Sequence, residues 1–169
     1  MAITRRHLLA ATAAAAAAGS LGVGGLVMRW WDQPNDAPWR CLSQEEIDFL
    51  EAMADAMFPA GGTPPMAGAD ANAARFFDEV IAAMEPTQGK LLRLLFNALD
   101  ASTMPTEGGI FSMLPVDERR AVIQEWLHAE LAEYRMAAQS VLVLVGTAYT
   151  VHPDTAHYFG PMYGCRYGA

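Results

Sequence analysis

The sequence predicts an all-α protein: a compact single-domain bundle of about five helices, preceded by an N-terminal signal helix and followed by an irregular aromatic, proline- and glycine-bearing tail. Apolar residues recur at three- and four-residue spacing in several long stretches, which is the period of a helix with one buried face. A capping motif stands before the first of these stretches. The single β-branched run, residues 141–145, has no second candidate strand with which it could pair.

The first expected helix has the clearest start and end. Ser43 and Glu46 form a capping box, in which each side chain satisfies a backbone N–H at the helix start. Pro59 ends the helix, and the following residues 60–65 are rich in glycine and proline. Its apolar face consists of Ile47, Leu50, Met53, Ala54 and Met57.

Two further helices are expected before residue 101. One begins after Asp70 and reaches about Met84; the other begins at Thr87, after Pro86. The second of these is apolar almost all round, which is typical of a central, buried helix. The segment 101–115 is expected to be a loop, with Phe111, Met113 and Leu114 packed on the core.

The longest helical pattern opens at Pro115 and Asp117 and continues into the run 141–145, which we interpret as a buried last helix. A break is expected near residues 137–140. From Tyr149 onward the proline and glycine residues predict irregular structure, while the aromatic residues require burial.

This tail is expected either to pack on its own domain or to face a partner. The residues expected at a partner interface are Tyr149, His152, Pro153, Tyr158, Phe159, Gly160 and Tyr163. Aromatic residues dominate the binding energy of many interfaces. The alternative is that these rings only cap the chain's own core.

Residues 1–31 have the layout of an export signal. Arg5 and Arg6 precede an alanine- and glycine-rich apolar stretch, with no acidic residue before Asp32, as in twin-arginine signals. This predicts export by the twin-arginine machinery to the periplasm or the outer face of the cytoplasmic membrane. Cleavage is favoured, and an uncut anchor that makes the chain a membrane-tethered helical adaptor is the alternative. Residues 32–42 are expected to be a linker, and residues 43–169 the helical domain.

The net charge limits the classes of partner, and the two cysteines allow a disulfide. Without Arg5 and Arg6 the 11 Lys and Arg fall to 9, against 19 Asp and Glu, a formal charge of −10. This acidity argues against binding nucleic acid, which needs a basic face. Cys41 and Cys165 could form a disulfide in an oxidising compartment, within the chain or to another subunit, or remain thiols.

The search for catalytic and cofactor motifs finds only weak candidates. Glu125 and His128 have the Glu-x-x-His spacing of di-iron bundles, but the sequence holds no second copy. His152 and His157 lie five residues apart, and a hydrogen-bonding role is expected for His152. A stand-alone exported metalloprotein or enzyme using these residues is the alternative to a chain without catalytic, cofactor or metal residues.

Several segments together resemble the gluconate 2-dehydrogenase subunit 3 family. They are the twin-arginine start, the capped helix over 42–59, the helix opening over 114–120, and the ending Gly146, Tyr149, His152-Pro153 and Phe159-Gly160-Pro161. The resemblance implies a non-catalytic small (gamma) subunit of an exported sugar or alcohol dehydrogenase. By the same resemblance, a glucose–methanol–choline type flavoprotein holds the FAD and a cytochrome c subunit with haem c often takes the electrons. The small subunit supplies the signal for co-export and stabilises the flavoprotein in a chaperone-like way.

Overall fold

The computed structural model describes residue 25 and residues 27–159. The chain divides into two units, Met1–Gln33 and Pro34–Ala169. In the first unit, residues 27–31 are helical, and the rest of the predicted signal, with Arg5 and Arg6, lies outside the described residues. No helix in the described part of the chain combines the length and the apolar character that crossing a bilayer requires.

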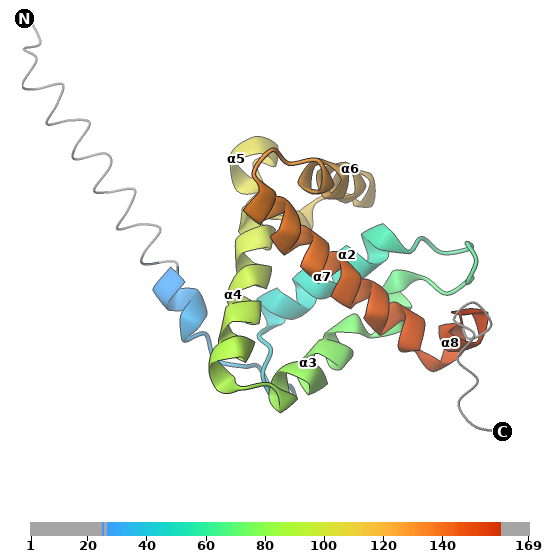
Figure 1. The fold of residues 1–169 in the computed structure, drawn as a ribbon, viewed down its shortest axis with the longest axis horizontal. Helices are drawn as coiled ribbons and strands as arrows, with labels where there is room; N and C mark the ends of the chain where they lie inside the picture. The colour runs from blue at the N-terminus through green and yellow to red at the C-terminus, as the bar shows by residue number, and fades with distance from the viewer. Residues whose placement is uncertain (1–24, 26, 160–169) are drawn as a thin grey trace, which may run out of the picture. The chain divides into compact units, whose positions relative to one another are not determined.

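The regular elements of the second unit are all helices, and residues 34–159 contain no strand, which confirms the predicted all-α class. Figure 1 shows α2 in the middle of the bundle, with the long α7 passing across it. The elements are α2 (Gln44–Met57), η1 (Gly68–Ala71), α3 (Ala73–Ala83), α4 (Pro86–Ala101), α5 (Met104–Glu107), η2 (Phe111–Met113), α6 (Val116–Leu127), α7 (Ala132–Val151) and α8 (Pro153–Phe159).

Helix α2 is the centre of the packing because it contacts α3, α4, α6, α7, η1 and η2. The predicted capping box is present: the Ser43 side chain accepts from the Glu46 N–H, and the Glu46 carboxylate accepts from the Ser43 N–H. Glu46 is itself buried, and Arg93 Nε and Asn97 Nδ2 of α4 donate to its carboxylate at 2.9–3.0 Å. The cap therefore also joins α2 to α4.

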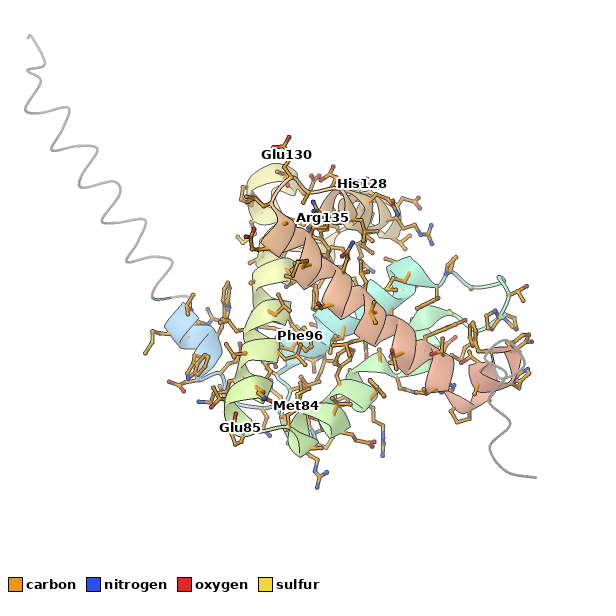
Figure 2. The ribbon with its side chains drawn as sticks, viewed as in Figure 1. Met84, Glu85, Phe96, His128, Glu130 and Arg135 are labelled. Atoms are coloured by element: carbon orange, nitrogen blue, oxygen red, sulfur yellow. The ribbon has the colours of Figure 1, made fainter. Side chains whose placement is uncertain are left out.

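Aromatic rings continue the core from one helix to the next. Phe77 meets Phe96 at 5.3 Å between ring centroids, Phe96 meets Phe49 at 6.0 Å, and Phe49 meets Phe111 at 5.7 Å. Phe111 then stacks on Trp126 of α6 at 4.9 Å. Figure 2 shows Phe96 among the side chains near the middle of the bundle. These rings link α3, α4, α2, η2 and α6.

The turn between α3 and α4 follows from its sequence. Pro86 occupies the first turn of α4, where a missing N–H costs nothing. Glu85 caps the helix by accepting from the N–H groups of Thr87 and Gln88 at 2.9 and 3.2 Å. Figure 2 shows Met84 and Glu85 at this turn.

The segment 101–115 is more ordered than the expected loop, because it contains α5 and η2. Phe111 and Leu114 are buried as predicted, whereas the prediction for Met113 is wrong, since it is 79% exposed. Arg119 of α6 holds this segment in place. Its guanidinium donates to the carbonyls of Leu114, Ser112 and Ala52 and to the Asp55 carboxylate at 2.7–3.4 Å.

The break in the longest helical pattern lies at residues 128–131, so the expected position near 137–140 is wrong. The run 141–145 is helical as predicted, but only one side is buried: Val141 and Val145 are inaccessible, and Val143 is 68% exposed. The predicted irregular tail also needs correction, since Tyr149 lies in α7 and residues 153–159 form α8. Pro153 starts that helix, as a proline can.

Candidate functional site

The structure separates the residues expected at a partner interface into two groups. Tyr149 is 1% exposed, stacks on Phe58 at 3.9 Å between ring centroids, and donates its hydroxyl to the Met66 carbonyl at 2.8 Å. Burial raises the pKa of this hydroxyl, with a further contribution from Tyr158. Tyr149 therefore fills the chain's own core and has no free face for a partner.

The other residues of this set lie at the end of α7 and on α8. Pro153 and Tyr158 are exposed, and His152 and Phe159 are half-buried. Phe159 makes an edge contact with Tyr149 at 6.5 Å. Gly160 and Tyr163 lie outside the described residues. Tyr158 is thus the aromatic residue of the set that the structure leaves accessible, at 37% exposure.

His152 has the hydrogen-bonding role that the sequence predicted. Its Nδ1 accepts from the Asp154 N–H at 3.3 Å, and its carbonyl accepts from the N–H groups of Thr155 and Ala156. The Thr155 hydroxyl also donates to the Tyr149 carbonyl. These bonds start α8 directly after α7 and fix the corner between them.

The candidate metal residues do not gather into a cluster. His128 Nδ1 lies 2.7 Å from the Gln124 carbonyl, and Glu125 is exposed. Figure 2 shows His128 at the α6–α7 connection, and His157 lies against Tyr158 on α8. Across residue 25 and residues 27–159, no three His, Cys, Asp or Glu side chains are grouped so that they could hold a metal ion.

Cys41 lies in a segment that is anchored to α3. The Asp78 carboxylate accepts from the N–H groups of Arg40, Cys41 and Leu42 at 2.8–3.2 Å. Part of the predicted linker is therefore bound to the domain. Burial, and then the Asp78 charge, raises the pKa of the Cys41 thiol. Cys165 lies outside the described residues, so the expected pairing stays a prediction.

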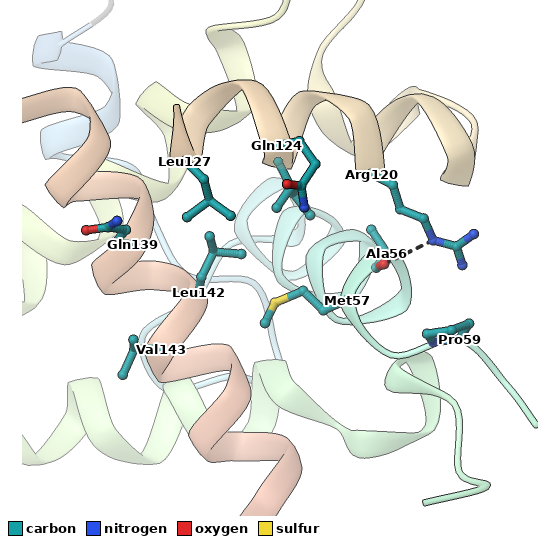
Figure 3. Close-up of a pocket in the computed structure, with 10 residues that line it drawn as sticks. Ala56, Met57, Pro59, Arg120, Gln124, Leu127, Gln139, Leu142 and Val143 are labelled. Atoms are coloured by element: carbon teal, nitrogen blue, oxygen red, sulfur yellow. Dashed lines mark hydrogen bonds between the residues drawn. The ribbon is translucent and has the colours of Figure 1, made fainter. Parts of the chain in front are cut away.

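A groove with a volume of about 770 Å³ lies between α6 and α7 (Figure 3). Helix α6 contributes one wall, α7 the other, and the end of α2 the floor. We call it the α6–α7 groove, and its lining residues are Ala56, Met57, Pro59, Arg120, Ile123, Gln124, Leu127, Gln139, Leu142 and Val143.

The groove exists because α2 ends early. Helices α2, α6 and α7 pack on one another, but α2 ends at Met57 and the chain turns away at Pro59. Figure 3 shows Met57 between the two walls. Beyond that point no third helix of the described residues lies between the apolar sides of α6 and α7. Val143 is exposed there, while the buried Ile123 and Leu142 line the groove.

Sequence reasoning did not identify this groove. Its apolar residues have the same spacing as core residues, and periodicity alone does not tell a filled face from an open one.

The chain matches the model of a known protein family. A family model described as Gluconate 2-dehydrogenase subunit 3 matches residues 44–156. The match begins at the first residue of α2 and ends within α8, so it spans the helical bundle described above. No curated protein and no solved structure matches the chain.

Proposed function

Because the chain belongs to the gluconate 2-dehydrogenase subunit 3 family, we propose that it is the small, non-catalytic subunit of an exported oxidoreductase complex. The family match over residues 44–156 is the observation that carries this proposal. In this view the partner is a glucose–methanol–choline type flavoprotein that holds FAD and oxidises a sugar or other alcohol. A cytochrome c subunit with haem c would complete the electron path.

The N-terminal segment supports a role in export. Arg5 and Arg6 stand before an apolar stretch free of acidic residues, which is the pattern of a twin-arginine signal. That route accepts folded cargo, so one signal serves a subunit and a partner bound to it. We therefore propose that the assembled complex reaches the periplasm or the outer face of the cytoplasmic membrane on this chain's signal.

Co-expression with the catalytic flavoprotein, which we expect a neighbouring reading frame to encode without a signal of its own, tests this function. The wild-type chain should co-purify with the flavoprotein in equal amounts from the periplasm. The double variant Arg5→Lys, Arg6→Lys should leave both proteins in the cytoplasm. Arg29→Lys, Arg40→Lys is the matched control and should not change export.

A flavoprotein that folds, binds FAD and is exported in the absence of this chain would contradict the proposal. Mass spectrometry of the mature N-terminus answers the related question of the anchor. A chain that begins after the alanine-rich stretch indicates cleavage, whereas a chain that retains residues 1–31 indicates a membrane tether.

A further inference from the structure

We propose that the α6–α7 groove binds a short apolar segment of the catalytic subunit, about two helical turns long, with a carboxylate next to Arg120. This inference rests on the proposed function, because it assumes a catalytic partner. It adds the place of contact and the chemistry of the bound segment.

The walls of the groove have the dimensions of a helix-binding site. The lining residues of α6 follow the spacing i, i+3, i+4 and i+7, from Arg120 to Leu127, and those of α7 follow i, i+3 and i+4, from Gln139 to Val143. At about 1.5 Å of rise per residue, the α6 wall is roughly 10 Å long. Grooves between two helices commonly accept the apolar face of a third.

The exposed side of α7 extends the apolar surface beyond the groove. Val143 is 68% exposed and Met136, two turns earlier on the same side of the helix, is 62% exposed. Gln139 lies between them and lines the groove. Exposed apolar side chains with polar residues beside them are typical of a protein–protein contact.

The charge of the groove indicates which kind of partner segment it can bind. Arg120 is the only charged residue that lines the groove in the described part of the chain. Its Nε donates to the Ala56 carbonyl at 3.2 Å and its Nη1 to Asp117 at 3.0 Å, which fixes the guanidinium at the end of α2. Figure 3 shows the Arg120 guanidinium at the Pro59 end of the groove.

The remaining donor capacity of this guanidinium complements a carboxylate. Arginine presents five N–H donors in a planar fork, and two of them are used by Ala56 and Asp117. The chain as a whole is acidic, with a net charge of −8, and Arg120 is already paired with the exposed Asp117 of its own helix. The N–H groups of the guanidinium that remain can donate to a second carboxylate. A partner segment with one Asp or Glu beside its apolar residues matches both properties.

Affinity measurements on the purified subunits test this inference. Val143→Asp should weaken binding of the catalytic subunit at least about tenfold, because it places an unpaired charge in the contact. Arg120→Gln should weaken binding by several-fold and reduce its dependence on salt. Met104→Asp, at an exposed methionine of α5 away from the groove, is the matched control and should bind as wild type.

Photo-cross-linking identifies the occupant directly. A photoreactive residue at Gln139 should cross-link to one catalytic-subunit peptide with apolar residues at helical spacing and an Asp or Glu. Cross-links to a second copy of this chain would overturn the inference in favour of a homodimer. Unchanged affinity of the Val143→Asp variant would also overturn it while leaving the proposed function intact. If the wild-type subunits form no complex at all, the proposed function fails as well.

Discussion

The two ends of α2 differ in how completely this chain surrounds them. At the N-terminal end the Glu46 carboxylate is buried and accepts hydrogen bonds from Ser43, Arg93 and Asn97. At the C-terminal end Met57 is half-buried and lines an apolar groove whose wall includes an exposed valine. One end of the same helix is completed by its own fold, and the other leaves apolar surface for a partner. Substitutions at the first end should therefore change stability, and substitutions at the second should change binding.

The largest effect is expected for Glu46→Gln. The variant removes the charge opposite Arg93, whose side chain is 11% exposed, and turns amide hydrogens toward existing donors. Because loss of one partner from a buried ion pair is strongly destabilising, we expect a loss of about 3 kcal/mol in the free energy of unfolding. Urea denaturation followed by circular dichroism measures it. The exposed Asp48→Asn is the control, with a change of about 0.5 kcal/mol or less.

Gly68→Ala should have the next largest effect and tests the contact of η1 with the last turn of α2. A Cβ atom on Gly68 would lie 1.8 Å from the Ala54 carbonyl oxygen and 2.3 Å from its carbonyl carbon. Because the obstacle is backbone, η1 would have to move away from α2, at a cost of about 2–3 kcal/mol. Gly109→Ala is the control, because the nearest neighbour of a Cβ there would be the Leu114 side chain at 3.8 Å, an ordinary van der Waals distance. Equal midpoints of denaturation for the two variants would show that η1 does not pack on α2 in this way.

A smaller effect is expected for Tyr149→Phe. Together with a variant of the accessible Tyr158, it distinguishes a role in the core from a role in binding. The variant loses the hydrogen bond to the Met66 carbonyl, and the free energy of unfolding should fall by about 1 kcal/mol. Its affinity for the catalytic subunit should equal that of wild type. Tyr158→Ala should show the reverse, with unchanged thermal stability and weaker binding. A large loss of affinity in Tyr149→Phe at unchanged stability would contradict the assignment of Tyr149 to the core.

The sequence predicted those structural features that depend only on residues close together along the chain. The capping box of α2 is a local motif, and its spacing alone identified Ser43 and Glu46. The bond from Arg93 to Glu46 joins residues 47 positions apart, and no local pattern indicates it. The same limit applies to the groove, which depends on where α2 ends relative to α6 and α7.

Two errors in helix boundaries also have physical reasons. The α6–α7 connection at residues 128–131 contains neither proline nor glycine, so no local signal marked the break. Pro153 was interpreted as a helix breaker, although proline is favourable in the first turn of a helix and here begins α8. The proline that led to the prediction of an irregular tail is therefore the residue at which α8 begins.

The smallest effect is expected for Asp100, a buried carboxylate that accepts from a backbone N–H, whereas Glu46 is paired with a cation. It accepts from the Ser112 N–H at 2.8 Å, but burial outweighs this bond and raises the pKa of its carboxyl. A carboxyl with a higher pKa in the folded state binds protons more readily when folded. The stability that the protonated Asp100 carboxyl contributes is therefore fully present below its unfolded-state pKa of about 3.9. It is lost as the pH rises through the folded-state pKa.

Asp100→Asn should remove this dependence, because the amide keeps an oxygen for the Ser112 N–H and does not ionise. The free energy of unfolding of the variant, relative to wild type, should rise between about pH 3 and pH 7. Urea denaturation at a series of pH values measures this difference, with Glu107→Gln on the exposed surface of α5 as the control for loss of one carboxylate. A difference that stays constant over this range would mean that the Ser112 N–H compensates the burial of Asp100 completely. A buried carboxylate of this bundle would then need no cation, and the ion pair of Glu46 would serve to join α2 to α4 rather than to neutralise a charge.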